Sequence, residues 1–187
     1  MKFGLVWVSI GRLIGFAILW LFVTNAYAQP YRTLTADDFQ GMPRTNNGEV
    51  VAYTNCSIDF RYEAHHERDY YVLNFNIVLT VNTDKSWMDR RRITSPEMLA
   101  EILKHEQGHY IIAYMEQQEL LREVSRTVFR ADYHYAAANI FNRVDAKYKQ
   151  LNSDYDEDTQ HMVNRQQQQS WDAYFKKRLD YMPPVSP

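Results

Sequence analysis

Cysteine is nearly absent from this chain of 187 residues, in which Cys56 is the only one. No intrachain disulfide can form, so the stability of the fold must come from packing or from a bound metal. Cys56 falls on the apolar side of a segment that alternates between apolar and polar residues. This position predicts a small buried side chain and not a nucleophile.

The sequence also lacks an excess of basic residues and any internal repeat. It has 21 Lys and Arg residues against 23 Asp and Glu residues, a net charge of −2 at pH 7. Such a balance gives no reason to expect nucleic acid or an anionic membrane as a partner. The length fits one domain that is large enough to bury a core.

Residues 1–28 lack an apolar run long enough for a comfortable membrane span, but they have the parts of a secretory signal peptide. Lys2 gives a positive start, Leu13–Val23 is almost wholly apolar, and Ala26–Ala28 ends with the small-x-small pattern of a cleavage site. We expect cleavage after Ala28, no stable membrane anchor afterwards, and a secreted or periplasmic location. An uncleaved N-terminal anchor is the alternative, and it too would place the folded domain outside the cytoplasm.

Two segments alternate between apolar and polar side chains, which is the pattern of half-buried strands. They cover residues 50–62 and 71–81, and a short polar connection at 64–69 joins them. This arrangement predicts an antiparallel hairpin with one face in solvent. A third strand is expected near residues 29–35 or 87–93.

In the second half of the chain, apolar residues recur at the spacing of helices. Ser95 can cap a helix, Pro96 suits its first turn and Glu97 favours its positive end, so a helix should run from about 96 to about 119. A second helix is expected within residues 122–150 and a third at about 162–180, separated by an acidic, turn-rich break at 152–158.

The predicted fold class is therefore α+β, with an antiparallel hairpin or small sheet followed by three helices. Residues 29–182 should form a single domain. The end of the chain, at 183–187, holds three prolines and should be a loose tail.

The first predicted helix contains the sequence Lys-His-Glu-Gln-Gly-His-Tyr at residues 104–110. His105 and His109 are one helical turn apart, so both imidazoles can reach one zinc ion. Glu106 lies about a quarter turn away, where it can take a proton from zinc-bound water and pass it to a leaving amine. This is the H-E-x-x-H arrangement of zinc peptidases.

The alternative is a helix with two partly buried, hydrogen-bonded histidines. Gly108 argues against it, because glycine inside a helix costs about 1 kcal/mol relative to alanine. The close approach of a neighbouring segment or of a substrate would explain this glycine.

A catalytic zinc ion normally has a third protein ligand, which the motif does not supply. The extended motif with a further histidine is absent, because Ile112 stands where its glycine would be. His161 is the favoured third ligand, since it lies at the start of the third predicted helix, where a rigid element can direct it. The other candidates are His134, Asp132 and Glu157.

Four stretches together resemble the bacterial secreted proteins grouped as domain of unknown function 922, which are usually described as predicted zinc-dependent proteases. These stretches are residues 34–41, 85–87, 103–110 and 155–161, the last of which leads to Gln169 and Trp171. Ala36 stands where tryptophan is expected, and Met162 where glycine or a small residue is expected. The resemblance covers about residues 33–175 and implies a zincin-like domain with the motif on its first long helix and His161 as a zinc ligand.

The resemblance also suggests roles for the residues before His161. Asp156 and Thr159 would orient His161, although Thr159 is equally well placed to cap a helix. Tyr155 would reach the site and stabilise an oxyanion, or it would simply be packed in the core.

These patterns lead to the expectation of a zinc metallopeptidase that acts on a peptide or protein substrate. Zn²⁺ is the expected cofactor, held by His105, His109 and His161, with Glu106 as general base and Tyr155 as a catalytic side chain. The alternatives are a zinc hydrolase acting on a non-peptide envelope bond, a non-enzymatic envelope protein with a structural zinc, and an interaction module without metal.

Overall fold

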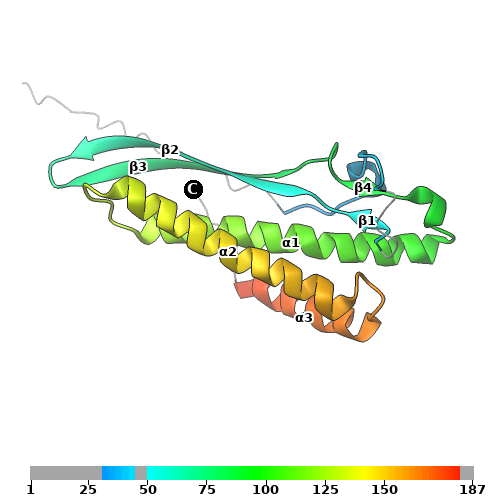
Figure 1. Ribbon diagram of the computed structural model, residues 1–187. Coiled ribbons are helices and arrows are strands. Elements are labelled where there is room, and N and C mark those ends of the chain that lie inside the picture. Colours follow the sequence, from blue (N-terminus) through cyan, green and yellow to red (C-terminus); the bar gives the residue numbers. More distant parts are fainter. Residues whose placement is uncertain (1–30, 45–49, 182–187) are drawn as a thin grey trace, which may run out of the picture.

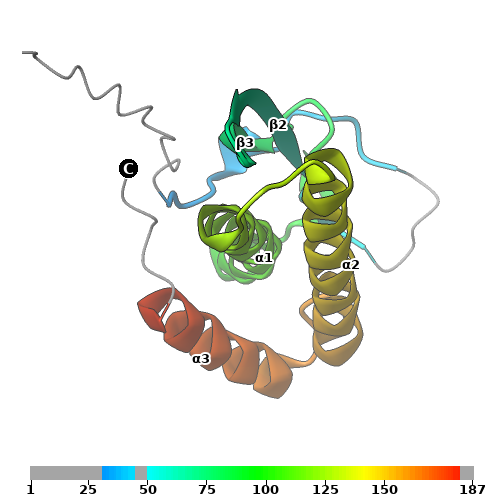
Figure 2. The ribbon, with the colours of Figure 1, turned by 90° about the vertical axis from the view of Figure 1, so that its left-hand side faces the viewer.

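The computed structural model describes residues 31–44 and 50–181, so the expected signal peptide and the tail at 183–187 lie outside the described residues. One long helix, α1 (Pro96–Arg126), forms the axis of the molecule. A β-hairpin covers one side of α1, while α2 (Tyr133–Thr159) and α3 (Arg165–Tyr181) pack on other sides (Figures 1 and 2). The predicted α+β class with three helices is confirmed.

The hydrophobic core lies around α1. Its buried side chains come from the inner face of the hairpin and from all three helices, and they include Ile77, Ile112, Met115, Leu120, Val144 and Phe175. Among the described residues, no helix combines the length and the apolar character that a membrane span requires.

The predicted hairpin is confirmed, and it is longer than predicted. Strand β2 (Cys56–Glu67) pairs antiparallel with β3 (Tyr70–Val81), and a two-residue turn joins them, with Arg68 at φ 33°. Residues 64–67, which were expected to form the loop, continue β2. They do so because pairing with β3 satisfies their backbone groups whatever the polarity of their side chains.

The single strand predicted over residues 50–62 is wrong, because the chain is divided there. Strand β1 (Ala52–Tyr53) pairs with β4 (Trp87–Met88) to form a second small sheet, and β2 begins only at Cys56. Between them Thr54 is buried and contacts α1. Strand β4 lies within residues 87–93, which is one of the two places predicted for a third strand.

Helix α1 begins as predicted, with the Ser95 hydroxyl accepting a hydrogen bond from the Met98 backbone N–H at 3.2 Å. It continues to Arg126, beyond the predicted end, because buried residues recur along it as far as Val124.

Helix α2 runs through residues 152–158, so the predicted break there is wrong. Tertiary packing overrides the turn-forming composition, since Tyr155 is fully buried within this segment.

The break between α2 and α3 lies at residues 160–164 and is built from left-handed backbone. Gln160, His161 and Met162 have φ values of 49°, 48° and 80°. Such values cost energy for residues with a side chain, whereas glycine adopts them readily. This explains why a glycine would suit position 162, where the chain has methionine.

Helices α1 and α2 approach each other closely at Gly108. A Cβ atom built on Gly108 would overlap the hydroxyl and ring of Tyr155. The Tyr155 ring stacks on the His105 imidazole at a centroid distance of 4.8 Å, and its hydroxyl donates to the His105 carbonyl oxygen at 3.0 Å. A neighbouring side chain therefore explains the glycine inside this helix.

We predict that Gly108→Ala lowers the stability of the protein. Alanine inside a helix is ordinarily favourable by about 1 kcal/mol. Overlap with the Tyr155 ring should reverse that sign, at a cost of about 1–3 kcal/mol. Thermal unfolding of the variant measures the effect.

The double variant Gly108→Ala/Tyr155→Leu is the control, because leucine removes the tip of the ring. It should be destabilised by less than the sum of the two single changes. A Gly108→Ala protein that melts at or above the wild-type temperature would contradict this account.

Candidate metal centre

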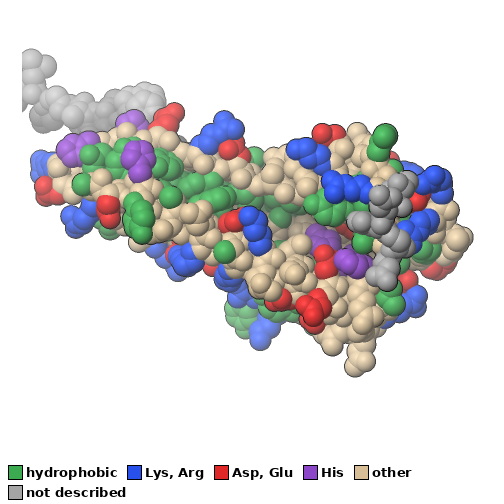
Figure 3. All heavy atoms as spheres, viewed as in Figure 1, with side chains coloured by type: hydrophobic (Ala, Val, Ile, Leu, Met, Phe, Trp, Pro, Cys, Tyr) green, Lys and Arg blue, Asp and Glu red, His purple; other side chains and the backbone are tan. Residues whose placement is uncertain are grey.

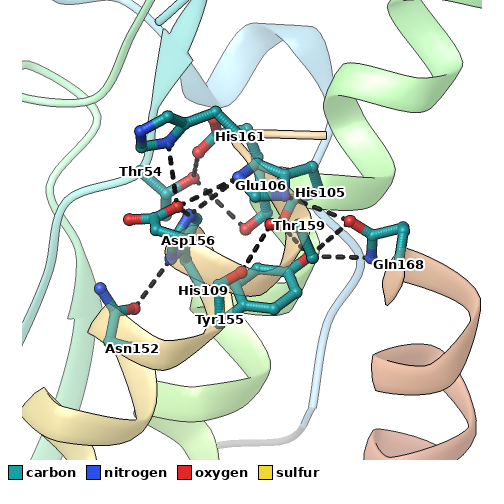
Figure 4. A network of polar contacts seen from close by, with 10 residues as sticks. All are labelled: Thr54, His105, Glu106, His109, Asn152, Tyr155, Asp156, Thr159, His161 and Gln168. Carbon is teal, nitrogen blue, oxygen red and sulfur yellow. Dashed lines mark hydrogen bonds and ion pairs between the residues drawn. The ribbon is translucent and has the colours of Figure 1, made fainter. Parts of the chain in front are cut away.

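The side chains of His105, His109 and Asp156 converge on one point between α1 and α2 (Figure 4). The two histidine Nε2 atoms are 3.3 Å apart, and they lie 3.3 Å and 3.2 Å from Asp156 Oδ1. Ligand atoms around a tetrahedral zinc ion with bonds of about 2.0–2.1 Å are about 3.3 Å apart. The three atoms thus have the spacing of three corners of such a site.

Side-chain amides hold the other nitrogen of each imidazole. His109 Nδ1 is 2.8 Å from Asn152 Oδ1, and His105 Nδ1 is 3.2 Å from Gln168 Oε1. The Gln168 amide is oriented by its own Nε2, which donates to Asp172 Oδ1 at 3.0 Å. Both Nδ1 atoms therefore donate, which leaves lone pairs on the Nε2 atoms that face Asp156. Three electron-rich atoms so close together require a proton or a metal ion between them.

The pKa shifts of these groups show the same preference for positive charge. Burial lowers the pKa of His109, but the hydrogen bond with Asp156 and the charges of Glu106 and Asp156 outweigh it and raise this pKa to about 9. Burial raises the pKa of Asp156, but when a proton and not a metal lies between these atoms, hydrogen bonds from His105 and His109 hold the pKa of Asp156 well below its usual range. A divalent cation would satisfy the same groups more fully than a proton.

His161 lies beside this group and contacts it through Asp156. Its Nδ1 is 3.2 Å from Asp156 Oδ1, and its side chain is 40% exposed. The ligand atoms of His105, Asp156 and His161 all lie within 4.8 Å of one another. The structure thus brings together the three histidines expected from the sequence, and it adds Asp156, which was expected only to orient His161.

The alternative ligands lie elsewhere. His134 Nδ1 is 2.8 Å from the Tyr62 hydroxyl, next to the outer part of the hairpin, while Asp132 and Glu157 are exposed. Thr159 plays neither of the two roles expected for it, because its hydroxyl donates to the Tyr155 carbonyl within α2 at 2.6 Å. It neither orients His161 nor caps α3.

Glu106 is held next to the histidines by a residue that the sequence analysis missed. Its side chain is buried, and Thr54 Oγ1 donates to Glu106 Oε2 at 2.6 Å. Glu106 also lines the cavity that His105 and His109 line. Thr54 was detectable in principle, because it is a polar residue at an inward position of an otherwise apolar strand face.

The Tyr155 ring packs against both imidazoles (Figure 4). Its side chain is fully buried, and its hydroxyl donates to the His105 carbonyl and accepts from Gln168 Nε2 at 2.9 Å. Burial raises the pKa of this phenol far above its usual value. Such a placement fits a role in fixing the two histidines and does not fit the expected role of stabilising an oxyanion.

Two cavities meet at the candidate metal centre. One, of about 270 Å³, extends toward Trp87 and Met162; the other, of about 360 Å³, extends toward Glu116. Tyr53, His109 and Asp156 line both. On the face seen in Figure 3, histidine and acidic side chains lie side by side in a hollow of the surface.

Cys56 lines the second cavity, where burial raises the pKa of its thiol to about 12. It therefore stays protonated, which agrees with the expectation that it is not a nucleophile.

Glu116 stands in the wall of the second cavity and should make stability depend on pH. Burial, with the charge of Asp145, raises the pKa of Glu116 from 4.5 to about 7, although Lys149 opposes the shift. The folded state therefore holds this proton more tightly than the unfolded chain. The resulting stabilisation is present below about pH 4.5 and is lost as the pH rises through about 7.

We predict that Glu116→Gln stabilises the metal-free protein at pH 8 and leaves its stability nearly unchanged at pH 4. Glutamine carries no charge to bury, and we expect a gain of about 1–2 kcal/mol at pH 8 once solvent screening is allowed for. Denaturant unfolding in the presence of a chelator measures it. Glu63→Gln, which removes an exposed charge on the hairpin, is the control. Equal effects of the two changes on stability at pH 8 would show that burial does not raise the pKa of Glu116.

Comparison with known proteins gives a family and no named function. No curated protein and no solved structure matches the chain. The family model described as "Bacterial protein of unknown function (DUF922)" matches residues 31–162. That range contains the hairpin, α1, α2 and all the converging side chains. The chain therefore belongs to the DUF922 family of bacterial proteins of unknown function.

Proposed function

We propose that this protein is a zinc-dependent hydrolase that cleaves peptide bonds outside the cytoplasm. The observation that carries the proposal is the convergence of His105 Nε2, His109 Nε2 and Asp156 Oδ1 beside the buried carboxylate of Glu106. Two neutral imidazoles and one carboxylate are a ligand set of catalytic zinc sites. The hydrogen bonds from Asn152 and Gln168 support it, because such partners fix the tautomer of zinc-bound histidines.

In this proposal His105, His109 and Asp156 hold the ion. His161, the third ligand expected from the sequence, lies beside them and shares Asp156. When bound, zinc supplies Lewis acidity, which polarises a carbonyl oxygen and makes water more acidic. The zincin-like fold implied by the resemblance belongs to the same proposal.

Glu106 does the proton transfer. Thr54 engages one of its oxygens, and no hydrogen bond from the described residues occupies the other. That second oxygen can take a proton from the attacking water and give it to the leaving amine. The buried position of Glu106 keeps this exchange away from bulk solvent.

A structural zinc in a non-enzymatic envelope protein is the second candidate. It is favoured by the position of His161, because four protein ligands close a zinc site and leave no place for a substrate. The two candidate functions assign different roles to His161 and Glu106. A structural site needs His161 as a fourth ligand, whereas a hydrolase needs Glu106 as a base.

We predict near one zinc ion per chain in protein purified without a histidine tag. His105→Ala, His109→Ala and Asp156→Ala should each reduce the zinc content to a small fraction of that, because each removes one of three ligands. His161→Ala should keep the zinc and weaken its affinity by about 10–100-fold, as the loss of a supporting partner does. Elemental analysis and chelator competition measure both quantities. If His161→Ala removes the zinc as completely as His105→Ala does, His161 is itself a ligand, as the sequence alone suggested.

We predict that Glu106→Gln retains the zinc and the fold but loses hydrolysis by at least about 10²-fold, because glutamine cannot accept the proton. A panel of peptides and cell-wall fragments tests both the activity and the kind of bond that is cleaved. Glu63→Gln is the control and should keep full activity. If zinc-loaded wild-type protein hydrolyses nothing in the panel, the structural-zinc candidate stands instead.

A further inference from the structure

The second cavity runs as a groove from the candidate metal centre to Glu116. His109 and Glu116 are seven residues apart on α1, so they lie on one helix face about 10 Å apart along the axis. Helix α2 runs antiparallel to α1 (Figure 1), and Asp156, Asn152, Lys149 and Asp145 follow one another along the cavity. One end of the groove is thus the candidate metal centre, and the other end is acidic.

The groove combines apolar walls with this acidic end. Ile58 of β2, Ile112 of α1 and Phe141 of α2 supply apolar surface along it. Such a surface suits methylene groups, and the carboxylate suits a cation. A long basic side chain has both parts.

Glu116 and Asp145 share one cation at the acidic end, which is Lys149. Lys149 Nζ pairs with Asp145 Oδ2 at 2.8 Å, and its charge opposes the raised pKa of Glu116 without cancelling the shift. A half-buried carboxylate whose charge is only partly compensated is costly to ionise, and a ligand cation would reduce that cost.

We propose that this groove binds the side chain of a lysine or arginine residue of the substrate, with its methylene groups against Ile112 and Phe141 and its cation at Glu116. This inference rests on the proposed function, because it takes the peptide backbone to lie at the metal centre. It makes Glu116 the residue that determines specificity. An acidic side chain in the same groove would meet Glu116 and Asp145 and would be rejected.

Peptide binding to zinc-loaded Glu106→Gln protein tests the inference, because this background leaves peptides uncleaved. The probes are pentapeptides of alanine, blocked at both ends, that carry one lysine at each position in turn. Matched peptides carry norleucine, which has the same stem without the charge, or glutamate. Titration calorimetry measures the dissociation constants.

We expect a lysine peptide in at least one register to bind at least tenfold more tightly than its norleucine match, and the glutamate peptide to bind most weakly. Adding Glu116→Gln should bring the lysine and norleucine peptides to within about twofold of each other. Adding Glu63→Gln should leave the preference unchanged. Adding Lys149→Gln should tighten lysine binding, because it frees the Asp145 carboxylate.

The inference is overturned if no lysine peptide is preferred, if none of the peptides binds, or if the preference survives Glu116→Gln. Its failure is distinct from that of the proposed function. Wild-type protein that cleaves peptides without regard to lysine would refute only the groove assignment. A lysine preference that depends on Glu116, in a protein that cleaves no peptide, would refute only the peptidase.

Discussion

The contact between Gly108 and Tyr155 is the constraint on which the candidate metal centre depends. With no side chain at Gly108, α2 can place the Tyr155 ring against α1, next to both histidines. The following residue of α2 is Asp156, so the same contact brings its carboxylate to the two Nε2 atoms. One helix supplies the histidines, the other supplies the charge, and a missing side chain sets the distance between them.

Much of the fold and part of the site followed from local patterns. The hairpin was predictable because alternation of apolar residues directly reflects a half-buried sheet. The start of α1 was predictable because Ser95 and Pro96 act on their own helix. The approach of His105 and His109 was predictable for the same reason, since their distance is fixed by helical geometry alone.

The other features depend on contacts between distant segments, which local patterns do not contain. Residues 152–158 look like a turn by composition, yet they are helical because Tyr155 is buried against α1. Thr54 interrupts a predicted strand because its partner is Glu106, 52 residues away. The closeness of Asp156 to the histidines arises from the packing of α2 on α1, so its contact with both imidazoles became visible only in three dimensions.

The hydrogen bond from His105 to Gln168 has a consequence for biosynthesis. Gln168 lies 63 residues after His105, and domains generally form as units once their chain is available. Until α3 docks, Gln168 cannot fix the tautomer of His105, so an incomplete or truncated chain carries the motif without this support. Under the proposed function, acquisition of the metal would therefore be tied to completion of the polypeptide.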